Sequence, residues 1–149
     1  MDNAQTREEL LNIARDCLAV RVRMINRVVT AAYEEELRPL GLKVSQMNIL
    51  VAVALFGPAR PSDVCRALHL DPSTLSRNVE RMKRKGWIET ITGRDGRSHV
   101  LKVTGEGFNI TEAARPAWEH GQARAAALLG EDGVAAIRRV GNELLRITE

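Results

Sequence analysis

The sequence is poor in cysteine, histidine and aromatic residues. Its 149 residues include two cysteines, Cys17 and Cys65, and three histidines, and aromatic residues make up 3% of the chain. Two cysteines cannot form the multi-disulfide framework of a small secreted protein, which favours a reducing compartment. No apolar run approaches the roughly 20 residues that span a bilayer, and the polar residues 2–9 do not resemble a signal peptide. We therefore expect a cytoplasmic protein with no membrane partner.

Motifs of enzymes and metal sites are also missing. His69, His99 and His120 lack the spacing of a metal-binding pair, and the sequence contains no glycine-rich phosphate loop or nucleophile elbow. We therefore predict no enzyme activity, no catalytic residue, no metal site and no cofactor. Because aromatic residues are scarce, the core must be built from Leu, Val, Ile and Ala, which is typical of a mainly helical protein.

Helix signals cover the N-terminal quarter of the chain. Thr6 and Glu9 have the spacing of a capping box, and nothing after them interrupts a helix until about Leu37. Pro39 and Gly41 then end it. The apolar residues of this segment recur with helical spacing and cover more surface than one neighbouring element could bury.

The C-terminal third is also expected to be helical. Thr104 should cap a helix over 105–129, which Pro116 should kink or split in two. After Gly130, a last helix is predicted over 131–147. These helices and the first one carry more apolar surface than one compact domain could cover, so we expect a homodimer.

The middle of the chain predicts a helix-turn-helix. A helix over 44–56 is apolar on nearly all sides and should be central, and a short helix over 61–68 precedes a basic helix over 72–86. Asp71 supplies the N-cap of the basic helix, and Gly86 can close it in a left-handed conformation.

The basic helix has two distinct faces. Leu75, Val79 and Met82 fall on one side, which can be buried. Hydroxyl groups at the helix start, followed by Arg and Asn, suit a helix that enters a DNA major groove, although an ordinary solvated face would look similar. The candidate DNA-binding residues of this helix are Ser73, Thr74, Ser76, Arg77, Asn78, Arg81 and Arg84.

A β-hairpin is predicted directly after this helix. Residues 87–91 and 99–103 alternate like strands, and the segment 92–98 between them contains Asp-Gly, a common hairpin turn. A basic hairpin that follows a helix-turn-helix is a wing, whose arginines can lie along the DNA backbone or enter the minor groove. Its candidate DNA-binding residues are Arg94, Arg97, Ser98 and His99.

The charge distribution agrees with this interpretation. Residues 72–102 contain eight basic and three acidic residues, a net +5, which leaves −2 for the remainder of a chain whose formal charge is +3. A basic middle between weakly charged ends is expected when one surface meets a polyanion.

The chain resembles the multiple-antibiotic-resistance regulator (MarR) family of winged helix-turn-helix transcription factors. The wing motif Asp-x-Arg-Ser, followed by Leu-x-Val-Thr-x-x-Gly, is the most specific part of this resemblance. The segments that carry it are 33–42 (YEEELRPLGL), Gln46, 70–77 (LDPSTLSR), 85–89 (KGWIE), 93–98 (GRDGRS) and 101–107 (LKVTGEG).

The resemblance implies a mainly α fold with a small β-hairpin wing. A winged helix-turn-helix over 43–104 would bind DNA, and residues 1–42 and 105–149 would form a helical dimerisation region. It implies a homodimer that binds palindromic promoter DNA, usually as a repressor, and that a small aromatic effector can release. Asp95 would brace the wing by pairing with an arginine.

Two alternative functions stay open. Cys17 lies near the segment that carries the reactive cysteine in hydroperoxide-sensing members of the family, which would make the chain a thiol-based peroxide sensor. In that resemblance the sensing position falls on Ala19, so Cys17 is displaced by two residues. The second alternative is a winged helix that contacts only proteins, against which the basic helix and wing argue.

Overall fold

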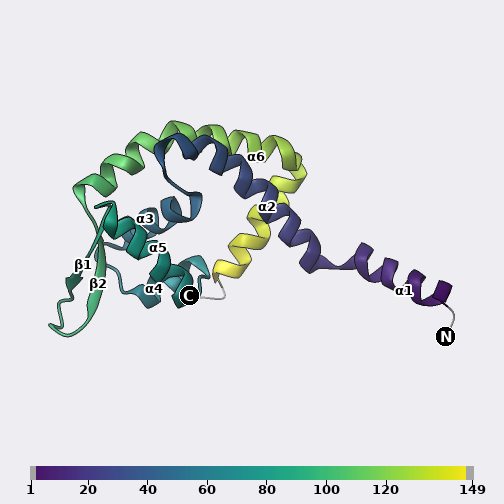
Figure 1. The fold of residues 1–149 in the computed structure, drawn as a ribbon, viewed down its shortest axis with the longest axis horizontal. Coiled ribbons are helices and arrows are strands. Elements are labelled where there is room, and N and C mark those ends of the chain that lie inside the picture. The colour runs from purple at the N-terminus through teal and green to yellow at the C-terminus, as the bar shows by residue number, and fades with distance from the viewer. Residues whose placement is uncertain (1–2, 147–149) are drawn as a thin grey trace.

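The computed structural model describes residues 3–146 and is mainly helical. Figure 1 shows α3, α4, α5 and a two-stranded hairpin gathered in one lobe, with α6 arching over it and α1 pointing away from the rest. We call α3, α4, α5 and the hairpin the winged lobe. The elements in chain order are α1 (Asn3–Asp16), α2 (Leu18–Leu37), the 3-10 helix η1 (Arg38–Leu40), α3 (Val44–Phe56), α4 (Pro61–Leu68), α5 (Pro72–Arg84), β1 (Ile88–Thr92), β2 (His99–Val103) and α6 (Gly105–Arg146).

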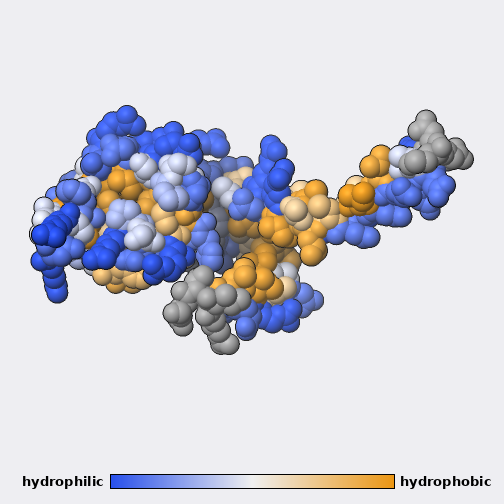
Figure 2. Space-filling model, turned by 90° about the horizontal axis from the view of Figure 1, so that it is seen from below, coloured by the Kyte–Doolittle hydropathy of each residue, from blue (hydrophilic) through white to orange (hydrophobic). Residues whose placement is uncertain are grey.

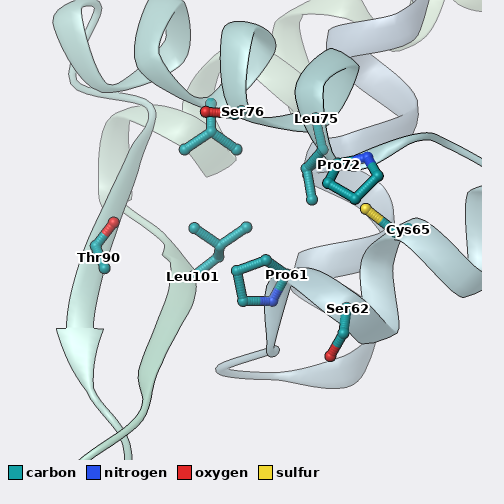
Figure 3. A pocket seen from close by; sticks show the side chains of 9 residues that line it. Pro61, Ser62, Cys65, Pro72, Leu75, Ser76, Thr90 and Leu101 are labelled. Carbon is teal, nitrogen blue, oxygen red and sulfur yellow. The ribbon is translucent and has the colours of Figure 1, made fainter.

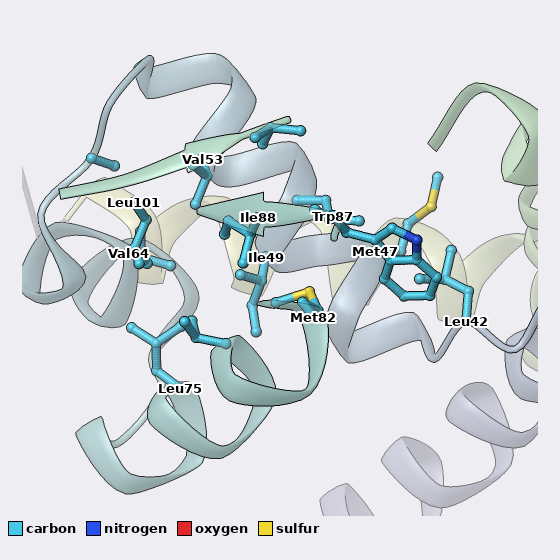
Figure 4. Close-up of a cluster of buried hydrophobic side chains, with 14 of the residues drawn as sticks. Leu42, Met47, Ile49, Val53, Val64, Leu75, Met82, Trp87, Ile88 and Leu101 are labelled. Carbon is cyan, nitrogen blue, oxygen red and sulfur yellow. The ribbon is translucent and has the colours of Figure 1, made fainter. Parts of the chain in front are cut away.

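The hydrophobic core lies inside the winged lobe. As predicted, α3 is central, because it contributes six buried residues, more than any other helix of this lobe. Side chains of α3, α4, α5 and both strands converge there (Figure 4). The residues that are at most 3% exposed in this cluster are Leu37, Leu42, Ile49, Leu50, Val53, Val64, Leu75, Met82, Ile88, Leu101 and Ala114. The predicted buried face of α5, with Leu75, Val79 and Met82, is confirmed.

The hairpin is fastened to the helices through its second strand. β1 and β2 pair antiparallel, with Ile88 opposite Val103 and Thr92 opposite His99. Ala59 adds a bridge on the other side of β2, since its amide and carbonyl exchange hydrogen bonds of 2.9 and 2.8 Å with Leu101. The segment that leads into α4 therefore fixes the position of the hairpin.

The second half of α2 packs along α6. Close approach is allowed by Gly121, where a Cβ atom would lie 2.9 Å from the Cα of Tyr33. Arg124 donates hydrogen bonds to the carboxylates of Glu35 and Glu36, and the Tyr33 hydroxyl donates to the side-chain oxygen of Gln122. These contacts hold α2 and α6 together.

The prediction of one unbroken N-terminal helix is wrong. Cys17 has φ −66° and ψ 105°, so the chain leaves the helical conformation there and α2 starts again at Leu18. The helix also begins at Asn3, so Thr6 lies inside α1 and is not its N-cap. The described side chains of α1 are nearly all exposed. A helix without packing contacts keeps only its own hydrogen bonds, so interrupting it costs little tertiary stabilisation.

Three further boundaries differ from the predictions. Of the kink or split predicted at Pro116, the split is wrong, whereas the predicted break at Gly130 is confirmed, since Gly130 (φ 69°, ψ 168°) is the single non-helical residue of α6 as far as Arg146. A proline removes one hydrogen bond, and packing of α6 on α2 outweighs that loss. α5 ends at Arg84, and β1 starts one residue late, because the Trp87 amide still bonds to the Met82 carbonyl at 3.0 Å. The predicted end of the last helix near residue 147 lies outside the described residues.

Within residues 3–146, no single helix is both long and apolar enough to cross a membrane. The segments Leu18–Leu40 and Val44–Phe56 are long and apolar enough only when taken together, and the chain bends by 82° between them.

Candidate nucleic-acid interface

The N-terminus of α5 is held by a network around Asp71. One carboxylate oxygen of Asp71 accepts hydrogen bonds from the Thr74 amide (3.1 Å) and the Ser73 hydroxyl, and the other accepts from the Thr74 hydroxyl (2.7 Å). The Ser73 and Thr74 side chains, followed by the Thr74 amide, hold the pKa of Asp71 well below its ordinary value. The predicted N-cap is therefore confirmed.

The candidate residues of α5 are not equally free to contact a partner. Asn78 is half-buried, and its amide nitrogen donates to the Thr74 carbonyl at 3.0 Å. The guanidinium of Arg77 lies 3.4 Å from the Thr74 hydroxyl, which aims it along the helix toward its N-terminus. Of the candidate residues on α5, those that are exposed are Ser73, Ser76, Arg77, Arg81 and Arg84. Asn78 and Thr74 thus support the helix start, whereas the arginines face solvent.

Asp95 organises the loop between the strands. Its Oδ1 atom accepts hydrogen bonds from the amides of Arg97 (3.0 Å) and Ser98 (2.8 Å) and from the Ser98 hydroxyl (2.7 Å). Its Oδ2 atom lies 3.4 Å from the guanidinium of Arg60, the residue before α4. The hydrogen bonds from Ser98 and Arg97, with a smaller contribution from Arg60, lower the pKa of Asp95 to about 2.

This low pKa makes the loop sensitive to acid. Because the folded-state pKa of Asp95 lies below the ordinary 3.8, the stabilisation by its hydrogen bonds is complete above pH 3.8 and is lost as the pH falls through about 2. We expect the Asp95 carboxyl carbon resonance to titrate near pH 2, while circular dichroism monitors the helices. The amide resonance of Ser98 should follow the same titration and should lose it in Asp95→Asn. A carboxyl that titrates at its ordinary value would contradict this geometry.

The loop presents its two arginines to solvent. Arg94 and Arg97 are exposed, as is His99 at the start of β2, whereas Ser98 is half-buried and bonded to Asp95. Gly96 has φ 70°, and its amide closes the turn on the Gly93 carbonyl at 2.9 Å. The turn, which the Asp95 carboxylate holds by hydrogen bonds, thus presents two exposed arginines to solvent.

Comparison with known proteins agrees with this geometry. The sequence model of the MarR family matches residues 40–98, which run from η1 to the hairpin loop. The chain is 28% identical over 80 residues to an uncharacterised helix-turn-helix transcriptional regulator of Bacillus subtilis, covering 54% of this chain and 58% of the relative. It is 29% identical over 90 residues to the multiple antibiotic resistance protein MarR of Salmonella typhimurium, covering 60% and 62%.

Solved structures extend the likeness to the long helices. The transcriptional regulator MosR of Mycobacterium tuberculosis, solved in complex with DNA, has a TM-score of 0.75 and 27% identity, over 89% of this chain and 96% of that one. Residues 40–98 of this chain are thus similar to the MarR family. The aligned segments span about 58 to 62% of the length of the curated MarR-family relatives above. These relatives are transcription regulators and not enzymes, in line with the prediction from sequence.

Sequence reasoning missed several residues that the MarR fold brings to this surface. Arg60 was not expected to be the arginine beside Asp95, because 35 positions separate them in the chain. Lys43 and Lys85 were also missed, although both lie beside Arg81 and Arg84 in the structure. Only contacts between distant segments reveal them, and no local pattern marks these residues.

The candidate redox residue Cys17 lies far along the chain from this surface, at the break between α1 and α2. Its thiol is free and half-exposed, and its carbonyl accepts hydrogen bonds from both the amide and the guanidinium of Arg21, each at 3.3 Å. Cys65 is half-buried and lines a cavity. Among residues 3–146, no three His, Cys, Asp or Glu side chains are grouped as metal ligands.

That cavity opens between α4, α5 and the hairpin (Figure 3) and has a volume of about 530 Å³. It borders the base of α5, since Ser76 and Leu75 lie on one side and Thr90 and Leu101 on another. Its full lining, which is mostly apolar, is Pro61, Ser62, Cys65, Pro72, Leu75, Ser76, Val79, Thr90 and Leu101.

Proposed function

We propose that this chain is a homodimeric, sequence-specific DNA-binding transcription regulator that acts as a repressor in the cytoplasm. In this proposal α5 lies in the major groove and the loop 93–98 reaches the neighbouring backbone or minor groove. The observation that supports it best is the exposed arginine face of α5, opposite the buried face with Leu75 and Met82. Binding of DNA by MosR, a relative of the same fold, supports it further.

The proposal assigns separate roles to the parts of the chain. Residues 43–104 bind DNA, and residues 1–42 and 105–149 form the dimer. Ser73, Ser76 and Arg77 contact bases, and Arg94, Arg97 and His99 contact the sugar-phosphate backbone or the minor groove.

Exposed apolar residues support the proposed homodimer. Leu18, Val22, Val140 and Leu144 are each more than half exposed in one chain. Figure 2 shows apolar residues gathered along the projecting arm and at its junction with the body. A groove of about 480 Å³ between α2 and the end of α6 is lined by Val22, Ile25, Asn26, Val29, Ala136, Ile137, Val140, Gly141 and Leu144. Water contact over so much apolar surface is unfavourable, and a symmetric partner would remove it.

Selection of bound sequences from random duplexes tests this function. We expect palindromic sites whose half-sites are separated by about 10 base pairs or a multiple of that spacing, because two α5 helices must enter successive major grooves. Enrichment of no sequence, or of a site without two-fold symmetry, would contradict the proposal.

The cavity beside α5 supports release by a small apolar or aromatic effector. A molecule there would contact α5 and β1 at once, so it would change their relative position and with it the fit to DNA. Cys65→Phe should fill the cavity without touching the exposed arginines. We expect compounds that dissociate the wild-type complex with its selected DNA to lose this effect on Cys65→Phe, while DNA affinity stays within about twofold. Equal release from both proteins would place the effector elsewhere.

A further inference from the structure

A basic depression lies where the C-terminal end of α5 meets the N-terminal end of α3. It has a volume of about 490 Å³. Its lining comes from two segments about 40 residues apart in the chain, and consists of Gly41, Lys43, Gln46, Arg81, Arg84 and Lys85. Four of these six residues carry a positive charge, and none is acidic.

The cations of the basic depression lack acidic partners. Among the described residues, no carboxylate oxygen lies within 4.0 Å of a side-chain nitrogen of Lys43, Arg81 or Arg84. The neighbouring Lys83, in contrast, lies 3.2 Å from Glu80. At the start of α3, the Glu34 carboxylate accepts a hydrogen bond from the Val44 amide at 3.0 Å. Like charges brought together without a counter-charge favour binding of an anion.

Two further residues make the depression a defined site. Gln46 is only 3% exposed, and its side-chain oxygen accepts a hydrogen bond from the Lys43 amide at 3.1 Å. Lys85 is held in place, because its ammonium donates to the Gly41 carbonyl and lies 4.3 Å from the centre of the Trp87 ring.

We propose that the basic depression is a phosphate-binding subsite, separate from the base-reading start of α5. Its position favours a phosphate of the DNA backbone, and in this form the inference rests on the proposed function. Arg77, Arg81 and Arg84 share one face of α5, and Arg84 lies about 10 Å beyond Arg77 along the axis. The major groove is about 12 Å wide. With Arg77 in the groove, Arg84 and Lys43 therefore reach the strand that borders it. A free phosphorylated ligand would offer the same chemistry.

Whether the subsite holds a phosphate of the DNA backbone is tested by the salt dependence of binding to a random duplex. The double variant Lys43→Ala/Arg84→Ala removes two exposed cations of the depression and leaves Gln46 and Lys85 in place. If each protomer holds one phosphate there, the slope of log affinity against log salt should fall by about 1.8 for a dimer. The matched control is Lys83→Ala/Arg115→Ala, which removes two cations outside the depression, each paired with a glutamate. Its slope should remain that of the wild type.

Whether the subsite holds a free phosphorylated ligand is tested without DNA. Inorganic pyrophosphate is titrated by calorimetry into the wild type and both variants. A reduced slope in Lys43→Ala/Arg84→Ala alone supports the backbone phosphate. An unchanged slope, together with pyrophosphate binding that only this variant loses, supports a free phosphorylated ligand. An unchanged slope without site-dependent pyrophosphate binding overturns the inference. If the wild type binds no duplex, the proposed function fails, and the pyrophosphate titration still decides the subsite.

Discussion

Val140→Asp is expected to make the protein monomeric and to abolish its tight binding to selected DNA. Val140 lines the apolar groove between α2 and α6 and is 54% exposed in the single chain, so a carboxylate there leaves the fold of one chain intact. In a dimer it would be buried without a partner, at a cost of several kcal/mol per ion. A cost of about 3 kcal/mol already raises the dissociation constant of the dimer more than 100-fold. Sedimentation equilibrium and DNA titration measure the two effects.

The matched control is Asn142→Asp. This residue follows Val140 by two positions on the same helix, is exposed, and does not line the groove. The substitution adds the same charge, so it should leave both the dimer and DNA affinity close to wild type. If Val140→Asp remains dimeric, or if the wild type sediments as a 16.5 kDa monomer at micromolar concentration, the proposed interface is wrong.

Arg77→Ala should have the largest effect on sequence recognition. Arg77 is exposed near the start of α5, and its guanidinium is aimed by the Thr74 hydroxyl. If Arg77 donates hydrogen bonds to a base edge, its loss weakens binding to the selected site by about 1–3 kcal/mol, or roughly 5- to 150-fold. Binding to random duplexes should change much less, so the ratio of the two affinities falls.

Arg97→Ala serves as the comparison for this measurement. Arg97 lies in the loop braced by Asp95 and has no acidic partner within 4.0 Å among residues 3–146, so we expect it to contact the sugar-phosphate backbone. Its loss should weaken binding to selected and random duplexes by a similar factor. An Arg77→Ala protein that retains its affinity for the selected site would show that α5 does not read the major groove.

Most of the winged lobe could be predicted because its signals are local. The predicted limits of α3, α4 and β2 agree with the structure, since Gly57-Pro58 and the start at Pro61 act on the backbone of their own segment. The N-cap at Asp71 is also a contact between residues three apart. The break at Cys17 could not be predicted in the same way. No proline or glycine marks it, and the absence of packing around α1 is a property of the whole fold.

In the candidate site, too, local features could be predicted from sequence and contacts between distant segments could not. Sequence alone determined that α5 has a buried apolar face and an exposed basic one, and that two arginines flank an Asp-Gly turn, because helical and strand periods fix directions within a few residues. Only the tertiary structure decided that Arg60 faces Asp95 and that Lys43 and Gln46 meet the end of α5. Those contacts depend on how the core around Ile49 and Met82 orients separate helices, and packing of that kind leaves no local pattern in the chain.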